Sequence, residues 1–299
     1  MAVTFANKLG MSLSVLEYGA TLTSLRVPDR AGVSAEIVLG LPDDGAYRVS
    51  PNRWGVMGPY AGRLCTPDGI VLHGGPAAFD KRDWARRDFE DCCSLGAIFT
   101  LEAPPLSVEL TYRLMKEENR LRLEYRAETT EAAVLNLTNH VYFNLAGAGA
   151  PGIGSHQIAI AADHVAEIDA RKVPTGRLLP VSGRLDLREP TRIETEFDHS
   201  YLFSDRAPGL KEVAVLDEPV SGRRMEIATT EPSLQVFTCN VFDGSEMGAQ
   251  GRPWQKHDGL ALETQHLPDS PNHPNFPSTE IRPGQSFHSV TSYLFSTLP

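Results

Sequence analysis

A run of strict apolar–polar alternation between residues 106 and 128 limits the possible fold more than any other feature of this sequence. Apolar side chains occupy every second position from Leu106 to Leu114. After a polar turn at Lys116–Asn119 the alternation resumes from Leu121 to Glu128. Successive side chains of a β-strand point to opposite faces, so this pattern predicts an antiparallel hairpin with one buried face.

Further short apolar or alternating runs predict strands throughout the chain. They lie at Leu13–Val15, Thr21–Val27, Ile37–Leu39, Ala133–Leu137, Ile158–Ala162, Val213–Leu216, Met225–Ala228, Leu234–Thr238 and Phe287–Phe295. No segment carries an apolar stripe of helical period and length, and no repeat or low-complexity linker divides the chain. We therefore expect an all-β fold, a large antiparallel β-sandwich, formed as a single domain by residues 1–299.

Composition and charge exclude several classes of function. The formal net charge of −10 argues against binding to the phosphate backbone of a nucleic acid. No apolar run approaches the roughly 20 residues of a membrane span, so no membrane partner is expected. The spacing of the four cysteines, Cys65, Cys92, Cys93 and Cys239, fits neither a disulfide framework nor a zinc site, which favours a reducing cytoplasm. The oligomeric state stays open.

The segment from Leu260 to Ser278 joins an apolar strand to a proline-rich stretch, and Glu263 lies at the junction. Proline recurs at every third position from Pro268 to Pro277, which predicts a stiff polyproline II arm. A rigid mount of this kind suits a catalytic carboxylate, although a surface loop after a core strand is an equally simple interpretation. His266, Asp269 and His273 could in principle bind a metal, but the intervening prolines do not require them to converge, so no metal site is expected.

Polar side chains at the ends of other predicted strands are further candidates for a site. His73 precedes two glycines, and His140 follows an apolar run. The remaining candidates are Arg63, Asp198 and Gln235. Each of these residues alone could equally have a structural role as a hydrogen-bonded polar group. Spacing along the chain does not show whether they meet.

Taken together, these strings resemble the aldose 1-epimerases, also called galactose mutarotases. The matching motifs, in chain order, are YGAT, YAGR, LHGG followed by FDKRDW, LTNHVYFNL, VPTGRLLPV, FDHSY, LQVFTCN and ALETQHLPDSPNHPNFPS. They cover nearly the whole chain, and the last is long and specific.

The resemblance implies a β-supersandwich whose cleft binds a free aldose as a small-molecule partner. It implies that Glu263 is the general base and His140 the general acid. The implied substrate contacts are His73, Arg63, Asp198 and Gln235. No metal or organic cofactor is expected. The residue types suit the reaction, because opening and reclosing the sugar ring needs one group to take a proton and another to supply one near neutral pH.

Two departures from the family pattern bear on specificity, and other activities stay open. Glycine at position 62 stands where the family commonly has asparagine, and the segment Leu64–Leu72 is short. Both predict an enzyme that discriminates weakly among aldoses. The alternatives are a non-catalytic carbohydrate-binding protein and a sugar-phosphate 1-epimerase, which would need a cluster of cationic side chains. A lyase or a glycosidase on a similar sandwich is a further possibility.

Overall fold

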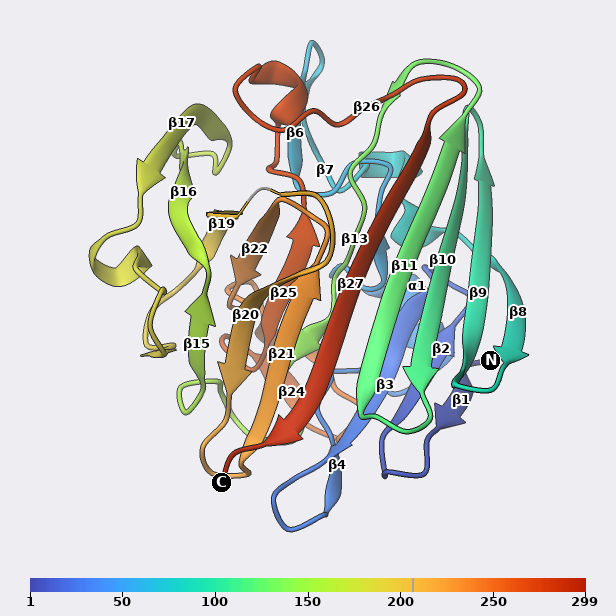
Figure 1. Cartoon of the computed structure of the whole chain (residues 1–299), viewed down its shortest axis with the longest axis vertical. Coiled ribbons are helices and arrows are strands. Elements are labelled where there is room, and N and C mark those ends of the chain that lie inside the picture. Colours follow the sequence, from blue (N-terminus) through green and yellow to red (C-terminus); the bar gives the residue numbers. More distant parts are fainter. Residues whose placement is uncertain (206) are drawn as a thin grey trace.

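The computed structural model describes residues 1–205 and 207–299, and these consist mainly of antiparallel strands (Figure 1). The largest sheet within these residues has nine strands. In order across the sheet they are β18 (Thr191–Arg192), β15 (Gln157–Ile160), β20 (Lys211–Asp217), β21 (Arg223–Thr229), β27 (Ser286–Thr297), β11 (Arg120–Thr129), β10 (Leu106–Met115), β9 (Ser94–Ala103) and β8 (Ala85–Glu90).

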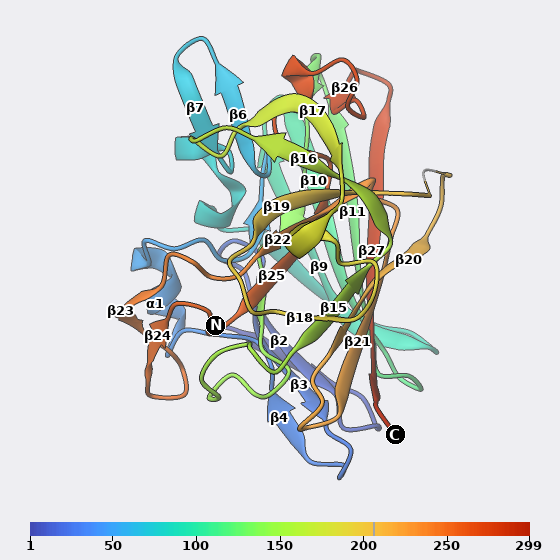
Figure 2. The same ribbon diagram turned by 90° about the vertical axis from the view of Figure 1, so that its left-hand side faces the viewer.

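A six-stranded sheet forms a second layer against the first. Its strands, in order, are β14 (Tyr142–Phe143), β25 (Leu260–Gln265), β22 (Ser233–Phe237), β19 (Asp198–Phe203), β16 (Ala162–Ile168) and β17 (Pro174–Pro180). Figure 2 shows the two layers from the side, with β11, β21 and β27 in one and β19, β22 and β25 in the other. The predicted β-sandwich of large antiparallel sheets is thus confirmed.

Smaller sheets and a few helical turns complete the described part of the chain. A four-stranded sheet contains β1 (Val3–Ala6), β2 (Ser12–Leu16), β3 (Thr21–Pro28) and β4 (Ser34–Glu36). Two-stranded pairs are β12 (Ala133–Val134) with β26 (Glu280–Ile281), β13 (Thr138–Asn139) with β5 (Val56–Met57), β23 (Asp243–Met247) with β24 (Pro253–Gln255), and β6 (Arg63–Thr66) with β7 (Gly69–Leu72). The helical segments are α1 (Asp44–Val49) and the 3₁₀ turns Gly75–Ala77, Phe79–Lys81, Gly183–Leu185 and Ser270–Asn272. Helix α1 is too short to produce an apolar stripe in the sequence. At its N-terminus the Asp43 carboxylate accepts hydrogen bonds from two backbone N–H groups.

The hairpin predicted from the alternation is confirmed as β10 and β11. Its register pairs Leu110 with Tyr125 and Leu114 with Leu121. All four of these side chains are buried. Strand β27 extends the same sheet on the far side of β11, so the hairpin predicted most clearly from the sequence lies in the interior of the larger layer.

Three of the predicted strands are wrong in detail. Ala133–Leu137 forms only the two-residue strand β12, followed by an isolated bridge between Asn136 and Tyr60. Ile37–Leu39 forms only an isolated bridge, between Val38 and Phe143. Its backbone hydrogen bonds go to two different segments: the Ile37 N–H donates to the Leu25 carbonyl and the Leu39 N–H donates to the Tyr142 carbonyl. The run is apolar because it is buried in the core and not because it lies in a ladder. The predicted strand Ile158–Ala162 is split, since β15 ends before residue 161 in one sheet and β16 begins after it in the other.

The predicted polyproline II arm is also wrong. Residues 266–279 fold back in successive turns, one of them the 3₁₀ turn Ser270–Asn272. The Asp269 carbonyl accepts the Asn272 N–H, and Asp269 itself has a left-handed φ of 60°. The segment packs against β6, where the Asp269 N–H donates to the Arg63 carbonyl at 2.9 Å. The hydrogen bond within the turn and the one to β6 together outweigh the tendency of spaced prolines to stay extended.

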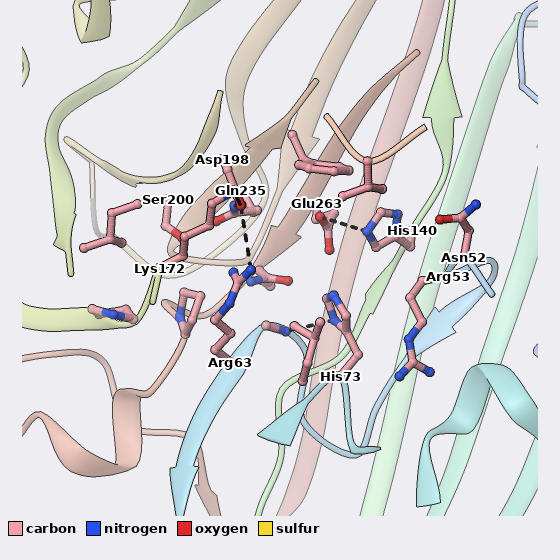
Figure 3. Close-up of a pocket in the computed structure, with 18 of the residues that line it drawn as sticks. Asn52, Arg53, Arg63, His73, His140, Lys172, Asp198, Ser200, Gln235 and Glu263 are labelled. Carbon is pink, nitrogen blue, oxygen red and sulfur yellow. Dashed lines mark hydrogen bonds and ion pairs between the residues drawn. The ribbon is translucent and has the colours of Figure 1, made fainter. Parts of the chain in front are cut away.

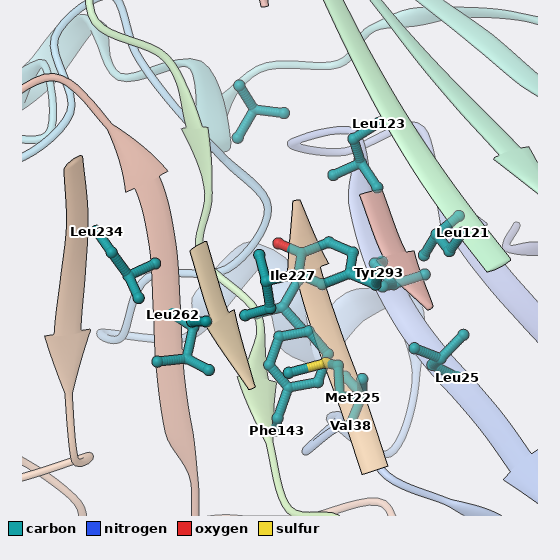
Figure 4. Close-up of a cluster of buried hydrophobic side chains, with 14 of the residues drawn as sticks. Leu25, Val38, Leu121, Leu123, Phe143, Met225, Ile227, Leu234, Leu262 and Tyr293 are labelled. Atoms are coloured by element: carbon teal, nitrogen blue, oxygen red, sulfur yellow. The ribbon is translucent and has the colours of Figure 1, made fainter. Parts of the chain in front are cut away.

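The core between the two layers explains why the six-stranded sheet can carry polar residues on its other face. Figure 4 shows Leu234 of β22 and Leu262 of β25 directed toward side chains of β21 and β27, such as Ile227 and Tyr293. Burial of each such side chain stabilises the fold by about 1.5–3 kcal/mol. Because side chains alternate along a strand, the neighbours of these leucines face away from the core.

In the two described stretches of the chain, no helix is both long and apolar enough to cross a bilayer.

Candidate active site

A cavity of about 410 Å³ lies on the face of the six-stranded sheet opposite the core. Figure 3 shows side chains from several strands and loops converging on it. The structure brings together all six side chains predicted as site residues, which are Arg63, His73, His140, Asp198, Gln235 and Glu263.

Three neighbouring strands of the six-stranded sheet supply one wall of this cavity. Gln235 of β22 pairs directly with Glu263 of β25 on one side and with Ser200 of β19 on the other. Paired residues across a ladder project from the same face, so the three side chains form a row. The Gln235 amide oxygen accepts a hydrogen bond from the Ser200 hydroxyl, and its amide nitrogen donates to Asp198 Oδ1 at 2.8 Å.

Glu263 and His140 lie next to each other in the wall of the cavity. His140 Nε2 lies 3.5 Å from Glu263 Oε1, as marked in Figure 3. Glu263 is 2% exposed and His140 5% exposed. Burial raises the pKa of Glu263 to about 8, since a carboxylate in this setting loses its hydration. Burial likewise lowers the pKa of His140 to about 4, because the imidazolium is the charged form.

The position of His140 follows from the short strand β13 and from aromatic packing. Its backbone N–H donates to the Gly55 carbonyl at 2.8 Å, directly after β13 pairs with β5. The imidazole ring packs on Tyr142, with ring centroids 4.8 Å apart, and contacts the edge of Phe237 at 6.1 Å. Tyr142 and Phe237 also line the cavity, so the imidazole lies among aromatic side chains of the cavity wall.

His73 is fixed at the end of the β6–β7 hairpin by two hydrogen bonds to Gly62. Its backbone N–H donates to the Gly62 carbonyl at 2.9 Å, and its Nδ1 accepts the Gly62 N–H at 3.1 Å. Because Nδ1 accepts, the neutral ring carries its proton on Nε2. Burial holds the pKa of His73 well below its usual range, so His73 presents a neutral N–H donor. Its backbone φ of 52° is uncommon for a side chain of this size.

Asp198 is surrounded by donors at one end of the cavity. Lys172 Nζ lies 2.8 Å from Asp198 Oδ2, and an Arg63 guanidinium nitrogen lies 3.8 Å from the same oxygen. With the Gln235 amide on the other oxygen, both carboxylate oxygens are occupied. Each of these contacts uses only one donor or one lone pair. The remaining N–H groups of Lys172 and Arg63 and the remaining lone pairs of Asp198 can bond hydroxyl groups.

Several residues that line the cavity were not predicted from the sequence. They are Asn52, Arg53, Tyr142, Lys172, Ser200 and Gln265. Arg53 is held by the fully buried Asp80, at 3.2 Å. Ser200 and Gln265 could have been found from alternation, since each lies two positions from a predicted site residue on its own strand. Lys172 lies on the turn between β16 and β17, and no local pattern pointed to it.

The glycine at position 62 is required by the backbone. Its φ is 77°, and a Cβ at this position would lie 2.8 Å from a Pro268 side-chain carbon. The absence of a side chain here therefore reflects close packing of β6 against the proline-rich segment as well as the shape of the cavity.

Of the three polar residues considered as metal ligands, His273 and Asp269 contact each other and His266 has a different partner. His266 Nδ1 lies 2.8 Å from Glu231, whereas His273 Nε2 lies 3.2 Å from Asp269. In the portion of the chain that the structure describes, no group of three or more His, Cys, Asp or Glu side chains is arranged to hold a metal ion.

Comparison with known proteins identifies the family to which this chain is similar. The family model described as aldose 1-epimerase matches residues 1–294. Mouse galactose mutarotase is 34% identical over 319 residues, covering 96% of this chain and 91% of the mouse protein. The aldose 1-epimerase of Escherichia coli is 32% identical, covering 98% of this chain and 94% of that protein.

Solved structures agree with the sequence matches. A GalM/aldose epimerase homologue from C. elegans superimposes with a TM-score of 0.91 at 25% identity, covering 100% of this chain and 99% of that one. Galactose 1-epimerase from Lactobacillus acidophilus has the same fold, with a TM-score of 0.83 at 23% identity and coverage of 99% and 94%. With its fold, its motifs and almost its full length matched, the chain belongs to the aldose 1-epimerase family, a family of isomerases.

Proposed function

We propose that this protein interconverts the α and β anomers of a free aldose by opening and reclosing the sugar ring. The observation that carries the proposal is the Glu263–His140 pair, 3.5 Å apart and buried beside a cavity of about 410 Å³. A buried acid–base pair next to a polar cavity suits a reaction that consists of two proton transfers. The family supports it, since relatives are named galactose mutarotase and aldose 1-epimerase.

In the proposed mechanism Glu263 is the base and His140 is the acid. The Glu263 carboxylate takes the proton of the anomeric hydroxyl as a C1=O double bond forms. The bond between C1 and the ring oxygen breaks, its electron pair stays on that oxygen, and His140 supplies the proton there. Rotation about the C1–C2 bond then presents the other face of the aldehyde. On reclosure His140 takes back its proton and Glu263 returns the other to the carbonyl oxygen, so neither residue is consumed.

The protonation state required is one proton on the pair. The pKa of Glu263, about 8, and that of His140, about 4, leave the pair with a single proton near neutral pH. With these two pKa values, the proton resides on Glu263 near neutral pH. Transfer to His140 gives the carboxylate–imidazolium form, and the total number of protons does not change.

Positioning of the sugar is assigned to the groups around the pair. We propose that His73 donates its Nε2–H to a sugar oxygen and that Arg63, Asp198 and Gln235 contact hydroxyl groups. No step requires a metal or an organic cofactor. The common core, with residues from β2 to β27 in one cluster, supports treating residues 1–299 as one catalytic domain. We also propose a cytoplasmic location, supported by four cysteines that are all free thiols.

A sugar phosphate is the second candidate substrate, because Lys172 and Arg53 line the cavity in addition to Arg63. Each of these cations already has a carboxylate partner, Asp198 or Asp80. A phosphate would therefore have to displace existing ion pairs, which favours the neutral sugar.

The test is polarimetry on freshly dissolved α-D-galactose and α-D-glucose, with and without the protein. The proposal predicts faster approach to the equilibrium rotation in proportion to protein concentration. A sugar that binds without any acceleration would instead support a carbohydrate-binding protein.

A further inference from the structure

Gln265 lies beside the proposed base on the same strand. It ends β25, two residues after Glu263, and so projects from the same face of the sheet. It lines the cavity, whereas its neighbour Thr264 faces the core and bonds the hydroxyl of Thr291 at 2.6 Å. Gln265 is thus part of the wall that carries Glu263, on the side nearest the β6–β7 hairpin.

The Gln265 amide has no hydrogen-bond partner within the described residues. The side chain is 1% exposed, and both Nε2 and Oε1 are buried and unpaired. A buried amide normally has its donors and acceptor satisfied, and leaving them unpaired is unfavourable. Glu263 Oε2 is buried and unpaired in the same way. Because that carboxylate is the proposed base, this property is consistent with a group that meets its partner only when a sugar is bound.

The other glutamine of the wall provides a contrast. Gln235 accepts from the Ser200 hydroxyl and donates to Asp198, so the protein already occupies both ends of its amide. Gln265 differs from it in having both ends free. Of these two glutamines, Gln265 has the greater capacity for a new hydrogen bond.

Glycine at position 62 keeps the approach to this amide open. A Cβ at that position would lie 3.4 Å from Gln265 Nε2. A longer side chain there would lie against the amide or compete for it. Gly62, directly before β6, and the amide of Gln265 are therefore neighbours in the cavity wall.

We propose that Gln265 is a specificity-determining residue that hydrogen-bonds a sugar hydroxyl remote from the anomeric carbon. Two residues along a strand correspond to about 7 Å, which is comparable with the width of a pyranose ring. With Glu263 at the anomeric hydroxyl, Gln265 reaches the hydroxyls on the opposite side of the ring. This inference rests on the proposed function, since it takes the position of the anomeric carbon from the role of Glu263.

The experiment compares wild type and Gln265→Leu on galactose and on its 2-deoxy, 3-deoxy, 4-deoxy and 6-deoxy analogues. The wild type is expected to lose about tenfold or more in kcat/KM on one analogue, because the amide is then left unpaired. Gln265→Leu is expected to lose about as much on galactose, mainly through KM, and no longer to distinguish galactose from that analogue. Its Tm should stay the same or rise, since an unpaired buried amide has been replaced by an apolar group of similar size.

Controls separate this role from a structural one. Thr264→Val changes the same strand on the core side and should lower Tm without changing the ranking of the analogues. Gln265→Met, which keeps an unbranched side chain, repeats the test if the leucine variant does not fold. Unchanged discrimination in a folded Gln265 variant would overturn the proposal, and so would a loss of Tm with KM unaltered.

The same comparison made by titration calorimetry distinguishes the two proposals. Binding of the sugars to wild type and variant reports on Gln265 even if no mutarotation occurs. Absence of turnover would reject the proposed function, whereas absence of any difference in analogue binding would reject the role of Gln265.

Discussion

Glu263 and His140 are buried next to each other, and their opposite pKa shifts leave the pair with one proton and no net charge at neutral pH. Their facing atoms are 3.5 Å apart, and burial moves the pKa of the carboxyl up to about 8 and that of the imidazole down to about 4. The pair thus combines a weak acid and a weak base, and both side chains are largely shielded from solvent.

Glu263→Gln should abolish most of the catalysed mutarotation while the fold stays intact. Glutamine is nearly isosteric but cannot take a proton, and general acid–base assistance contributes about 10²–10⁴ in rate. Polarimetry with purified protein measures the effect, and circular dichroism checks the fold. Glu280→Gln, at an exposed position on β26, is the matched control. A Glu263→Gln variant with near wild-type rates would remove the assignment of the base.

The rate should be nearly constant between about pH 4 and pH 8 and fall outside that range. Below about pH 4 His140 is protonated as well as Glu263, so the pair carries two protons. Above about pH 8 Glu263 loses its proton, so the pair carries none. The measurement is kcat/KM against pH, corrected for the uncatalysed reaction. A single limb centred near pH 6.5 would show instead that a histidine with an ordinary pKa controls the rate.

Replacing Glu263 should also change how stability depends on pH. The carboxyl has a raised pKa in the folded state, so between about 4.5 and 8 the folded protein binds more protons and its stability falls as pH rises. Glu263→Gln removes this pH dependence. The free energy of unfolding of the variant, relative to that of the wild type, should therefore increase by at most about 1.4 kcal/mol per pH unit, up to about pH 8. Urea unfolding of both proteins at several pH values measures the difference. A difference independent of pH would mean that the carboxyl is not desolvated.

His140→Asn and His73→Asn should differ in kinetics. Loss of the proposed acid affects the transition state, so His140→Asn is expected to lower kcat by about 10²–10⁴ with a much smaller change in sugar affinity. His73 presents a neutral donor to ground and transition states alike, so its loss should weaken affinity and rate together. Steady-state kinetics combined with binding measurements separates the two. Equal losses of affinity and turnover in His140→Asn would contradict the division of roles.

Gly62→Asn is expected to destabilise the protein and not simply to sharpen its specificity. Asparagine tolerates the φ of 77° better than most residues, but its Cβ would lie 2.8 Å from Pro268. We expect about 1–3 kcal/mol lower stability, as in other overpacked sites. Gly62→Ala, which adds only the Cβ, should show most of this loss. Full stability in both variants would show that the proline-rich segment can move away.

The prediction of weak discrimination among aldoses is tested directly on the wild type. Comparison of kcat/KM for galactose, glucose, xylose and arabinose is the appropriate measurement, because it leaves the packing at position 62 unchanged. A preference of a hundredfold for one sugar would contradict it.

The fold could be predicted from sequence where one face of a strand is solvated. The hairpin of β10 and β11 was found because polar residues alternate with residues such as Leu110 and Tyr125. Ile37–Leu39 has no such alternation, since all three side chains are buried, and its apolar run does not distinguish a strand from a core segment. The turns after Gln265 were missed because their hydrogen bonds depend on the contact with β6.

The site was predictable only in part. Motif resemblance identified Glu263 and His140, but nothing in their spacing showed that they come within 3.5 Å of each other. Lys172 was missed because its contact with Asp198 depends on how the β16–β17 turn folds over the sheet. Alternation along β25 could have indicated Gln265, two positions after Glu263, but that its amide is unpaired is a property of the three-dimensional surroundings alone.

Strands β22 and β25 present leucines to the core and Gln235 and Glu263 to the cavity. A shift of either strand by one residue would exchange these two sets, burying the reactive groups among hydrocarbon side chains. Evolution therefore has little freedom to move the chemistry without unfolding the protein. New sugar preferences should arise instead on the turns that border the cavity, at positions such as Asn52 and Lys172, where a substitution alters the substrate's surroundings and leaves the sheet in place.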